Sequence, residues 1–225
     1  MQLLAEGAKS LGIQLSKGQL DQFELYYREL AEWNGRSNLT SLIGYEEVQV
    51  RHFLDSLTVC LPYGGQAGLG VCALPGVNRV VDIGAGAGFP GLPLKLAFPS
   101  VELHLIESVG KKTAFLDHLV GSLGLAGVNI HTGRAEALAR LPELRESFDL
   151  GAVGGHTVAH KHGGLDAELT EAEFALSELG GRTTGVFPVT LEGLTDDRVV
   201  VQFEKAAPTP ERYPRRVGIP AKRPL

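Results

Sequence analysis

Apolar residues recur at helical spacing through the first sixty residues of the chain. Directly after Ser16, a residue type that suits a helix start, the apolar positions follow at steps of three or four: Leu20, Phe23, Tyr27, Leu30 and Trp33. This pattern predicts an amphipathic helix that ends at Asn34-Gly35. A second helical stretch is expected over residues 45–61. The glycine-rich segment 63–77 has the composition of a loop, so it separates this helical cap from the rest of the chain.

From residue 78 onward, short β-branched runs alternate with helical stretches. The β-branched runs predict strands at 79–83, 101–106, 128–131 and 148–153. The stretches between them predict helices at 92–97 and 111–123. Such alternation is typical of a parallel sheet covered on both faces. We therefore expect an α/β fold with a doubly wound, mostly parallel sheet of seven strands.

The remainder of the chain predicts a helix at 165–179 and two closing strands, at 184–188 and 198–203, that pair as an antiparallel hairpin. The chain then divides into three parts: a helical cap with its linker (1–77), an α/β domain (78–205), and a tail (206–225) rich in proline and basic residues. We expect the tail to lie extended over the surface.

Composition and charge narrow the class of protein. With 225 residues, 44% hydrophobic and 21% charged, the chain is long enough for a substantial core and is not disordered, collagen-like or a coiled coil. The net charge of −5 argues against a polyanionic partner, but residues 205–225 carry six basic residues against Glu211, a local charge of +5. The first 204 residues then sum to −10, so the average hides a basic tail on an acidic body.

The chain shows no signal peptide and no run of about 18 apolar residues, so we expect a cytoplasmic protein that does not enter a membrane. Its two cysteines, Cys60 and Cys72, are expected to be buried thiols in a reducing compartment. A disulfide between them is the alternative.

A glycine-rich turn follows the first predicted strand directly. Gly84, Gly86 and Gly88 allow the backbone to approach a ligand where any Cβ would collide. A dinucleotide-binding fingerprint requires its third glycine at position 89, which is Phe89 here, so the spacing is G-x-G-x-G. Taken alone, this turn also fits a purely structural role.

Two carboxylates lie beside this turn in the predicted sheet. Glu107 ends the second strand. A carboxylate at this place can accept hydrogen bonds from both hydroxyls of a ribose. The alternative is a glutamate at the strand end that is solvated and binds nothing. Asp82, at the carboxyl end of the first strand, suits an ammonium group on the ligand. Nicotinamide and flavin cofactors have no such amine, whereas S-adenosylmethionine has an amine and a sulfonium. The two acids and the turn together favour S-adenosylmethionine as cofactor.

The glycine turn resembles motif I of the class I S-adenosylmethionine-dependent methyltransferases. Further stretches are similar to the bacterial GidB or RsmG family of 16S rRNA guanine-N7 methyltransferases: Trp33-Asn34, Asn38-Leu39-Thr40, Arg51 to Ser56, Gly88 to Gly91, Gly110-Lys111-Lys112, Phe115-Leu116 and Tyr213 to Pro220. This resemblance covers nearly the whole chain. It implies transfer of a methyl group from S-adenosylmethionine to N7 of one guanine in 16S rRNA.

By position, the resemblance assigns the family's cofactor contacts to four residues: Gly84, Phe89, Ala135 and Glu136. The last two also fit the start of a helix with a favourably placed acid. Because guanine N7 already carries an in-plane lone pair, the reaction requires no general base and depends on alignment and on stabilising the moving charge. We therefore expect no catalytic triad.

The expected RNA contacts are basic or polar side chains that reach phosphates on 16S rRNA or the small ribosomal subunit: Arg51, His52, Lys111, Lys112, Arg212, Arg215 and Arg216. Those on the two predicted helices have simpler alternatives. Arg51 and Asp55 share a helix face and suit a pair that clamps the cap to the sheet. Lys111 and Lys112 suit a solvated helix start. We expect a monomer.

One region departs from the family pattern. After the strand that ends at Val153, the family continues with an arginine that touches the cofactor, a helix, a glycine pair and the fifth strand. Here Gly154-Gly155 follow at once, and residues 156–161 resemble the fifth strand. Two residues cannot join parallel strands, because a crossover takes roughly ten or more. Either about twenty residues are absent from this sequence, the explanation we favour, or the sheet is changed.

A separation of Val153 from His156 beyond roughly 11 Å would support the missing segment. The histidines His156, His160 and His162 alternate along this stretch, but no fourth ligand or zinc spacing accompanies them, so we expect no metal. Two alternative functions stay open: a ribosome-binding module with a degenerate cofactor pocket, and a class I methyltransferase with a non-RNA substrate.

Overall fold

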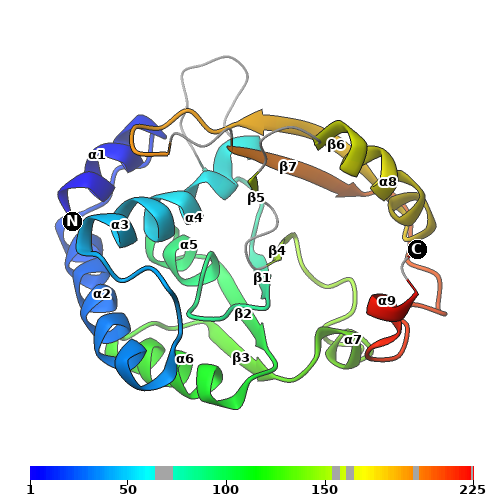
Figure 1. The fold of residues 1–225 in the computed structure, drawn as a ribbon, viewed down its shortest axis with the longest axis horizontal. Helices are drawn as coiled ribbons and strands as arrows, with labels where there is room; N and C mark the ends of the chain where they lie inside the picture. The colour runs from blue at the N-terminus through cyan, green and yellow to red at the C-terminus, as the bar shows by residue number, and fades with distance from the viewer. Residues whose placement is uncertain (64–72, 154–157, 161–164, 195–197, 224) are drawn as a thin grey trace.

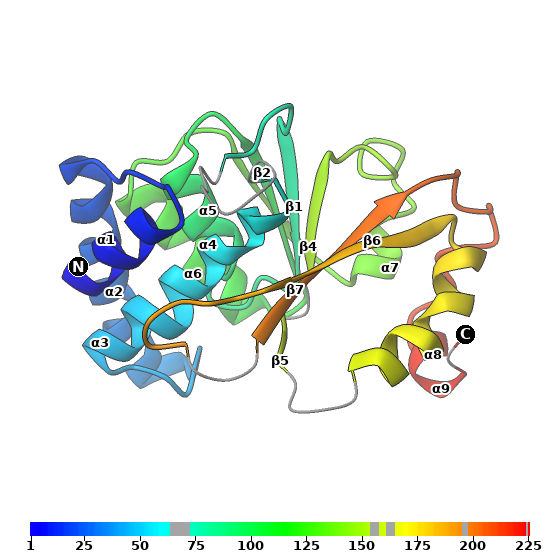
Figure 2. The same ribbon diagram turned by 90° about the horizontal axis from the view of Figure 1, so that it is seen from above.

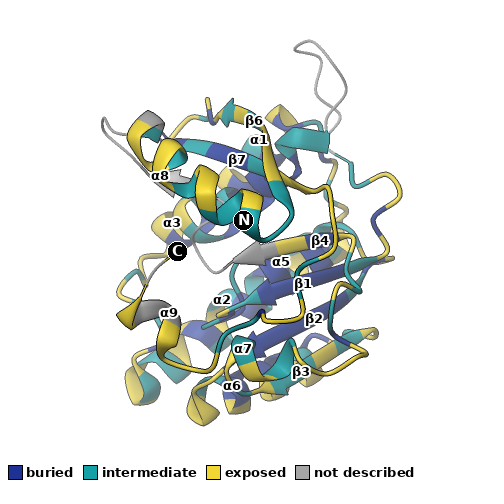
Figure 3. Ribbon diagram, turned by 90° about the vertical axis from the view of Figure 1, so that its right-hand side faces the viewer, coloured by how far each residue is buried: buried dark blue, intermediate teal, exposed yellow. Residues whose placement is uncertain are grey.

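A four-stranded parallel sheet lies at the centre of the molecule (Figure 1). The computed structural model describes residues 1–63, 73–153, 158–160, 165–194, 198–223 and 225. The central strands run in the order β3-β2-β1-β4, with β1 at Arg79–Ile83, β2 at Glu102–Glu107, β3 at Val128–Thr132 and β4 at Leu150–Val153. Most residues of β1 and β2 are buried, as their dark blue ribbons show in Figure 3. This agrees with the apolar runs that predicted them.

The connections between these strands contain the two helices expected from sequence and a third, shorter one. They are α5 (Gly91–Ala97), α6 (Gly110–Ser122) and the short α7 (Ala135–Leu138). Every pairing within this sheet is parallel, with Val80 opposite Leu103 and Leu150. The carboxyl ends of all four strands therefore meet at one edge, which is where parallel α/β sheets bind their ligands.

The N-terminal helices pack on α5 and α6 and share one core with the sheet. They are α1 (Gln2–Ser10), α2 (Lys17–Ser37), α3 (Tyr45–Val48), the π-helical turn η1 (Gln49–Leu54), α4 (Asp55–Leu57) and the 3₁₀ turn η2 (Thr58–Tyr63). Phe23 and Phe53 of these helices and Leu103 of β2 are all fully buried in that core. These helices form the cap, and burial of apolar side chains in the shared core holds the cap to the sheet.

Helix α2 begins where predicted and ends later. Ser16 accepts from the backbone of Gln19 (3.3 Å) and Gln19 accepts from that of Ser16 (2.8 Å), a reciprocal cap. The predicted end at Asn34-Gly35 is wrong, because one interior glycine costs only about 1 kcal/mol. The helix instead ends where Asn38 adopts a left-handed conformation (φ 47°).

A separate antiparallel sheet contains the last three strands. It has the order β5-β7-β6, with β5 at Val158–His160, β6 at Gly181–Pro188 and β7 at Arg198–Lys205, and α8 (Leu165–Glu178) packs on β6. The closing hairpin is confirmed. The expected single sheet of seven strands is wrong, since β4 and β5 belong to different sheets. Two separate sheets are consistent with both explanations for the short connection, a missing segment and a changed sheet.

The separation between Val153 and His156 falls outside the described residues. The tail lies against α8 and the connection from α7 to β4, and it ends in a short helix, α9 (Ile219–Lys222). Arg145 holds it by donating to the carbonyl oxygens of Thr209 (3.0 Å) and Tyr213 (2.9 Å). Figures 1 and 2 show the cap and the tail at opposite ends of the long axis.

Candidate functional site

The glycine loop leaves β1 along the carboxyl end of β2. The backbone N–H groups of Gly84 and Ala85 both donate to the carbonyl oxygen of Ile106, at 2.7 and 3.0 Å. Gly84, Gly86 and Gly88 have φ values of 78°, 58° and 99°, which glycine adopts without steric cost. Gly84 is exposed, and a Cβ added there would meet no atom within 4 Å. The loop therefore presents open backbone at the sheet edge.

Glu107 holds this loop from β2, as its position in the sequence predicts. One carboxylate oxygen accepts from the backbone of Gly86 (3.0 Å) and the other from that of Val109 (2.8 Å). The carbonyl oxygen of Glu107 accepts from Gly133 (2.9 Å), which brings the start of α7 to the same edge. The glycine loop, Glu107 and the segment containing Ala135 and Glu136 thus come together at the carboxyl ends of β1, β2 and β3.

Asp82 lies beneath the loop and is fully buried. Its Oδ2 accepts from the backbone of Gly91 (2.9 Å), and its Oδ1 has no hydrogen-bond partner among the described residues. Burial raises the pKa of Asp82 from 3.8 to about 8; the Gly91 hydrogen bond opposes this rise, and the charge of Glu107 adds to it. In this conformation Asp82 supports the start of α5 and does not reach the surface.

Phe89 follows the third glycine and contacts the cap. It is half-buried, and its ring lies parallel to that of His52 at a centroid distance of 4.4 Å. Burial lowers the pKa of His52 to about 4, so the ring is neutral, and its Nε2 lies 2.9 Å from the hydroxyl of Thr40. The predicted contact of His52 with an RNA phosphate gains no support from this geometry. Arg51, its neighbour, is exposed.

The expected pair between Arg51 and Asp55 is replaced by another. Asp55 forms an ion pair with Arg198 of β7, whose side chain is buried. Arg51 lies in the π-helical turn η1 and is exposed. An ion pair thus joins the cap to a sheet, through Arg198 and not through the predicted Arg51.

The basic residues expected to contact RNA lie in two separate places. Lys111 and Lys112 lie in the first turn of α6, while the tail arginines lie at the far end of the long axis (Figures 1 and 2). Arg212 forms an ion pair with Glu178, and Arg215 donates to the carbonyl oxygen of Arg223 (2.5 Å). Arg216 is exposed. The structure does not gather these cations into one patch.

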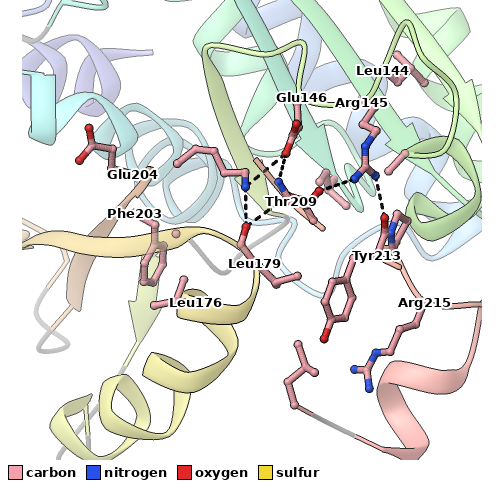
Figure 4. A pocket seen from close by; sticks show the side chains of 16 residues that line it. Leu144, Arg145, Glu146, Leu176, Leu179, Phe203, Glu204, Thr209, Tyr213 and Arg215 are labelled. Atoms are coloured by element: carbon pink, nitrogen blue, oxygen red, sulfur yellow. Dashed lines mark hydrogen bonds and ion pairs between the residues drawn. The ribbon is translucent and has the colours of Figure 1, made fainter. Parts of the chain in front are cut away.

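A cavity of about 650 Å³ lies where the two sheets part. Ile83 of β1, Leu144 before β4, Leu176 of α8, Phe203 of β7 and Tyr213 of the tail are among its lining residues (Figure 4). Crossovers between parallel strands are right-handed, so a connection from β4 to a neighbouring parallel β5 would lie on the face that carries α7 and α8. The cavity borders Ala139, which follows α7, and Leu176 of α8.

Cys60 is fully buried and disulfide-bonded, so the expectation of a free thiol there is wrong; Cys72 lies outside the described residues.

Within the described part of the chain, no group of three or more His, Cys, Asp or Glu side chains could hold a metal ion. His156 and His162 lie outside that part. No helix among the described residues is long and apolar enough to cross a membrane.

Sequence reasoning missed two elements of the site. Tyr26 is fully buried against the glycine loop, although the helical pattern places Tyr27 on the apolar stripe. Thr40 belongs to the site through its contact with His52. One feature of the sequence could have indicated this contact. Asn38-Leu39-Thr40 and the segment that begins at Arg51 both resemble the same family, so the two segments could be expected to lie together.

A family model described as "GidB: rRNA small subunit methyltransferase G" matches residues 19–150. The ribosomal RNA small subunit methyltransferase G of Dehalococcoides mccartyi (strain CBDB1) is 41% identical over 244 aligned positions, covering all of both chains. That of Roseiflexus castenholzii is 43% identical over 237 positions, covering 97% of each. A candidate O-methyltransferase from Klebsiella pneumoniae has a similar fold, with a TM-score of 0.52 at 13% identity, over 81% of this chain and 90% of that one.

The lengths of these alignments bear on the short connection after β4. All 225 residues align over 244 positions with the Dehalococcoides protein, so at least 19 positions of that alignment have no counterpart here. This difference agrees in size with the crossover of about twenty residues that the sequence predicts to be missing. The family model also ends at residue 150, the first residue of β4.

Proposed function

The chain belongs to the GidB family of ribosomal RNA small subunit methyltransferase G, and from this premise we propose that it transfers a methyl group from S-adenosylmethionine to N7 of one guanine in 16S rRNA. The observation that carries the proposal is the glycine loop, which is open at Gly84 and hydrogen-bonded to Glu107 at the carboxyl edge of the sheet. This is where parallel α/β sheets bind nucleoside cofactors.

The residues at this edge fit S-adenosylmethionine. Gly84 leaves space for the ligand to approach the backbone, and the carboxylate of Glu107 retains lone pairs for the two ribose hydroxyls. Asp82 places an acidic group beneath the loop, where the cationic ammonium and sulfonium groups favour its ionised form. Ala135 and Glu136, which Gly133 brings to the same edge, are proposed to contact the adenine.

The bound cofactor supplies an electrophilic methyl group on a sulfonium sulfur. The protein's part is to hold donor and acceptor in line, because the lone pair of guanine N7 attacks without prior loss of a proton. Positive charge would pass from the sulfur to the purine as the N7–C bond forms and the S–C bond breaks, leaving S-adenosylhomocysteine; Glu107 would be the acidic group at the edge, with the buried Asp82 beneath the loop. No general base and no metal enters this scheme.

The substrate side of the proposal depends on the basic residues. Arg216 on the tail and Lys111 on α6 are exposed and suit phosphate contacts, with 16S rRNA or the small subunit as partner. Because these cations lie far apart, the RNA would contact the protein over an extended surface. We propose that the chain acts as a monomer in the cytoplasm.

The break after β4 bears on both fold and function. We propose that the two sheets represent one doubly wound order, β3-β2-β1-β4 followed by β5-β7-β6, interrupted by loss of the crossover. The family's cofactor-contacting arginine belongs to that crossover and has no counterpart that can be assigned here. This loss favours one alternative function, a ribosome-binding module whose cofactor pocket has degenerated.

Incubation with S-adenosylmethionine labelled in its methyl group separates these functions. The acceptors are small subunits and bare 16S rRNA, both from cells that lack the modification. We expect label in the RNA of at least one acceptor. Label on neither acceptor, with binding to the subunit retained, would support the ribosome-binding module instead. Label on a small molecule or protein only would keep the enzyme class and reject the RNA substrate.

A further inference from the structure

Three nearly parallel aromatic rings connect the cap to the glycine loop. The ring of Phe89 lies 5.4 Å from that of Tyr26, with 7° between their planes, and 4.4 Å from that of His52, with 11° between them. Tyr26 belongs to α2 and His52 to η1, so two separate cap elements contact one residue of the loop. Parallel aromatic pairs of this kind contribute beyond the area that they bury.

Tyr26 also contacts the loop backbone directly. Its hydroxyl donates to the carbonyl oxygen of Ala87 (2.6 Å), and it is fully buried. Burial raises the pKa of Tyr26 well above its ordinary value, so the hydroxyl keeps its proton. A Cβ added to Gly88 would lie 2.7 Å from the Tyr26 oxygen, which shows how closely the two chains approach. The second half of the loop is therefore fastened to α2.

His52 is held in turn by polar groups of the cap. The hydroxyl of Thr40 lies 2.9 Å from Nε2 of His52 and accepts from the backbone of Leu42 (3.1 Å). The backbone of Thr40 donates to the side chain of Asn34 (2.9 Å). A continuous set of contacts thus runs from the end of α2 through Thr40 and His52 to Phe89. These contacts fix the orientation of the imidazole.

We propose that Tyr26 and His52 are positioning residues for the cofactor, which they serve by fixing the segment from Ala87 to Phe89. The inference rests on the proposed function. Three glycines with positive φ give the loop many alternative conformations, and a loop that orders only on binding loses affinity to that ordering. The cap removes this loss by holding the loop in one conformation. The cap, and not the sheet alone, then sets the affinity for S-adenosylmethionine.

The Tyr26→Phe variant tests the hydroxyl while keeping the ring. We expect the Kd for S-adenosylmethionine to rise roughly fivefold, the equivalent of one neutral hydrogen bond, and its KM to rise in parallel. The KM for rRNA and kcat should stay within about twofold of wild type, a split that general destabilisation does not produce. Tyr27→Phe is the matched control on the same helix: it removes a hydroxyl that donates to Ile43 (3.3 Å), away from the loop, and should leave the Kd unchanged.

Two variants at His52 test the stacked ring independently. His52→Ala should raise the Kd for S-adenosylmethionine, and His52→Phe, which restores a ring against Phe89, should recover part of the loss. All titrations are made at a temperature at which circular dichroism shows the variants folded. Unchanged affinity in both Tyr26→Phe and His52→Ala, with wild type binding normally, would overturn the inference and leave the proposed function standing. Absence of binding by wild type would overturn both.

Discussion

Replacing the buried carboxyl beneath the glycine loop, Asp82→Asn, should make the protein without cofactor more stable, and increasingly so as the pH rises. Asp82 is fully buried, its only described hydrogen bond comes from Gly91, and its pKa is raised to about 8. In the unfolded chain the same group ionises near 3.8. Asparagine keeps an oxygen for Gly91 and has no charge to bury.

The size of the effect follows from these two pKa values. Below about pH 4 Asp82 is neutral in both the folded and the unfolded state, so its ionisation adds no difference between the free energies of unfolding of wild type and variant. Between pH 4 and 8 the carboxyl ionises only on unfolding, which lowers the wild-type free energy of unfolding by about 1.4 kcal/mol per pH unit. A shift of about four units gives a limit on the order of 5 kcal/mol, reached near pH 8, where the folded carboxyl also ionises.

Urea unfolding of both proteins at pH 5, 6, 7 and 8 measures this difference. The stability advantage of Asp82→Asn should grow steadily across the series. The control, Asp149→Asn, has the opposite sign, because backbone groups of Arg79 and Asn78 lower the pKa of Asp149. That variant should be less stable than wild type by a constant amount from pH 5 to 8, and the difference should shrink only below the unfolded pKa of 3.8, where the unfolded wild-type carboxyl is protonated. An advantage for Asp82→Asn that stays constant from pH 5 to 8 would refute the reasoning.

Three further changes test the packing and the RNA surface. Gly88→Ala should destabilise the protein by about 2 kcal/mol or more in urea unfolding and weaken S-adenosylmethionine binding in calorimetry, since its Cβ would lie 2.6 Å from Leu92 at a φ of 99°. Arg198→Met should cost about 3–5 kcal/mol by leaving the Asp55 carboxylate without its cation, and adding Asp55→Leu should recover most of this loss. Arg216→Ala should reduce the salt dependence of rRNA binding by about one phosphate contact in filter binding, with S-adenosylmethionine affinity unchanged.

The parallel sheet and the glycine loop could be predicted from sequence because the strand pattern and the turn residues indicate the same structure. The β-branched run at 79–83 is observed as β1 with the same bounds, and the glycines after it allow the turn. Glu107 was placed beside the loop by topology alone, since neighbouring parallel strands end at one edge, and its hydrogen bond to Gly86 agrees with this.

The parts that could not be predicted depend on contacts between distant segments. The π-helical turn η1 has no sequence signature, and the ion pair of Asp55 with Arg198 joins residues far apart in the chain, which no local pattern predicts. Tyr26 and Tyr27 suit the buried face of a helix equally well. Only the approach of the glycine loop decides that Tyr26 is the buried one. The short spacing after Val153 predicted an irregular connection, but the division into two sheets depends on the balance of all the strand pairings.

The proposed activity is methylation of guanine N7 by a chain that lacks the crossover after β4. It is tested most directly by treating unmodified 16S rRNA or small subunits with the protein and S-adenosylmethionine, then reducing the RNA with borohydride and cleaving it with aniline, which cuts at N7-methylguanosine. We predict one new cleavage site that requires both protein and cofactor. Methyl label in the RNA without such cleavage would contradict the assigned atom, and absence of both label and cleavage would contradict the enzymatic function itself.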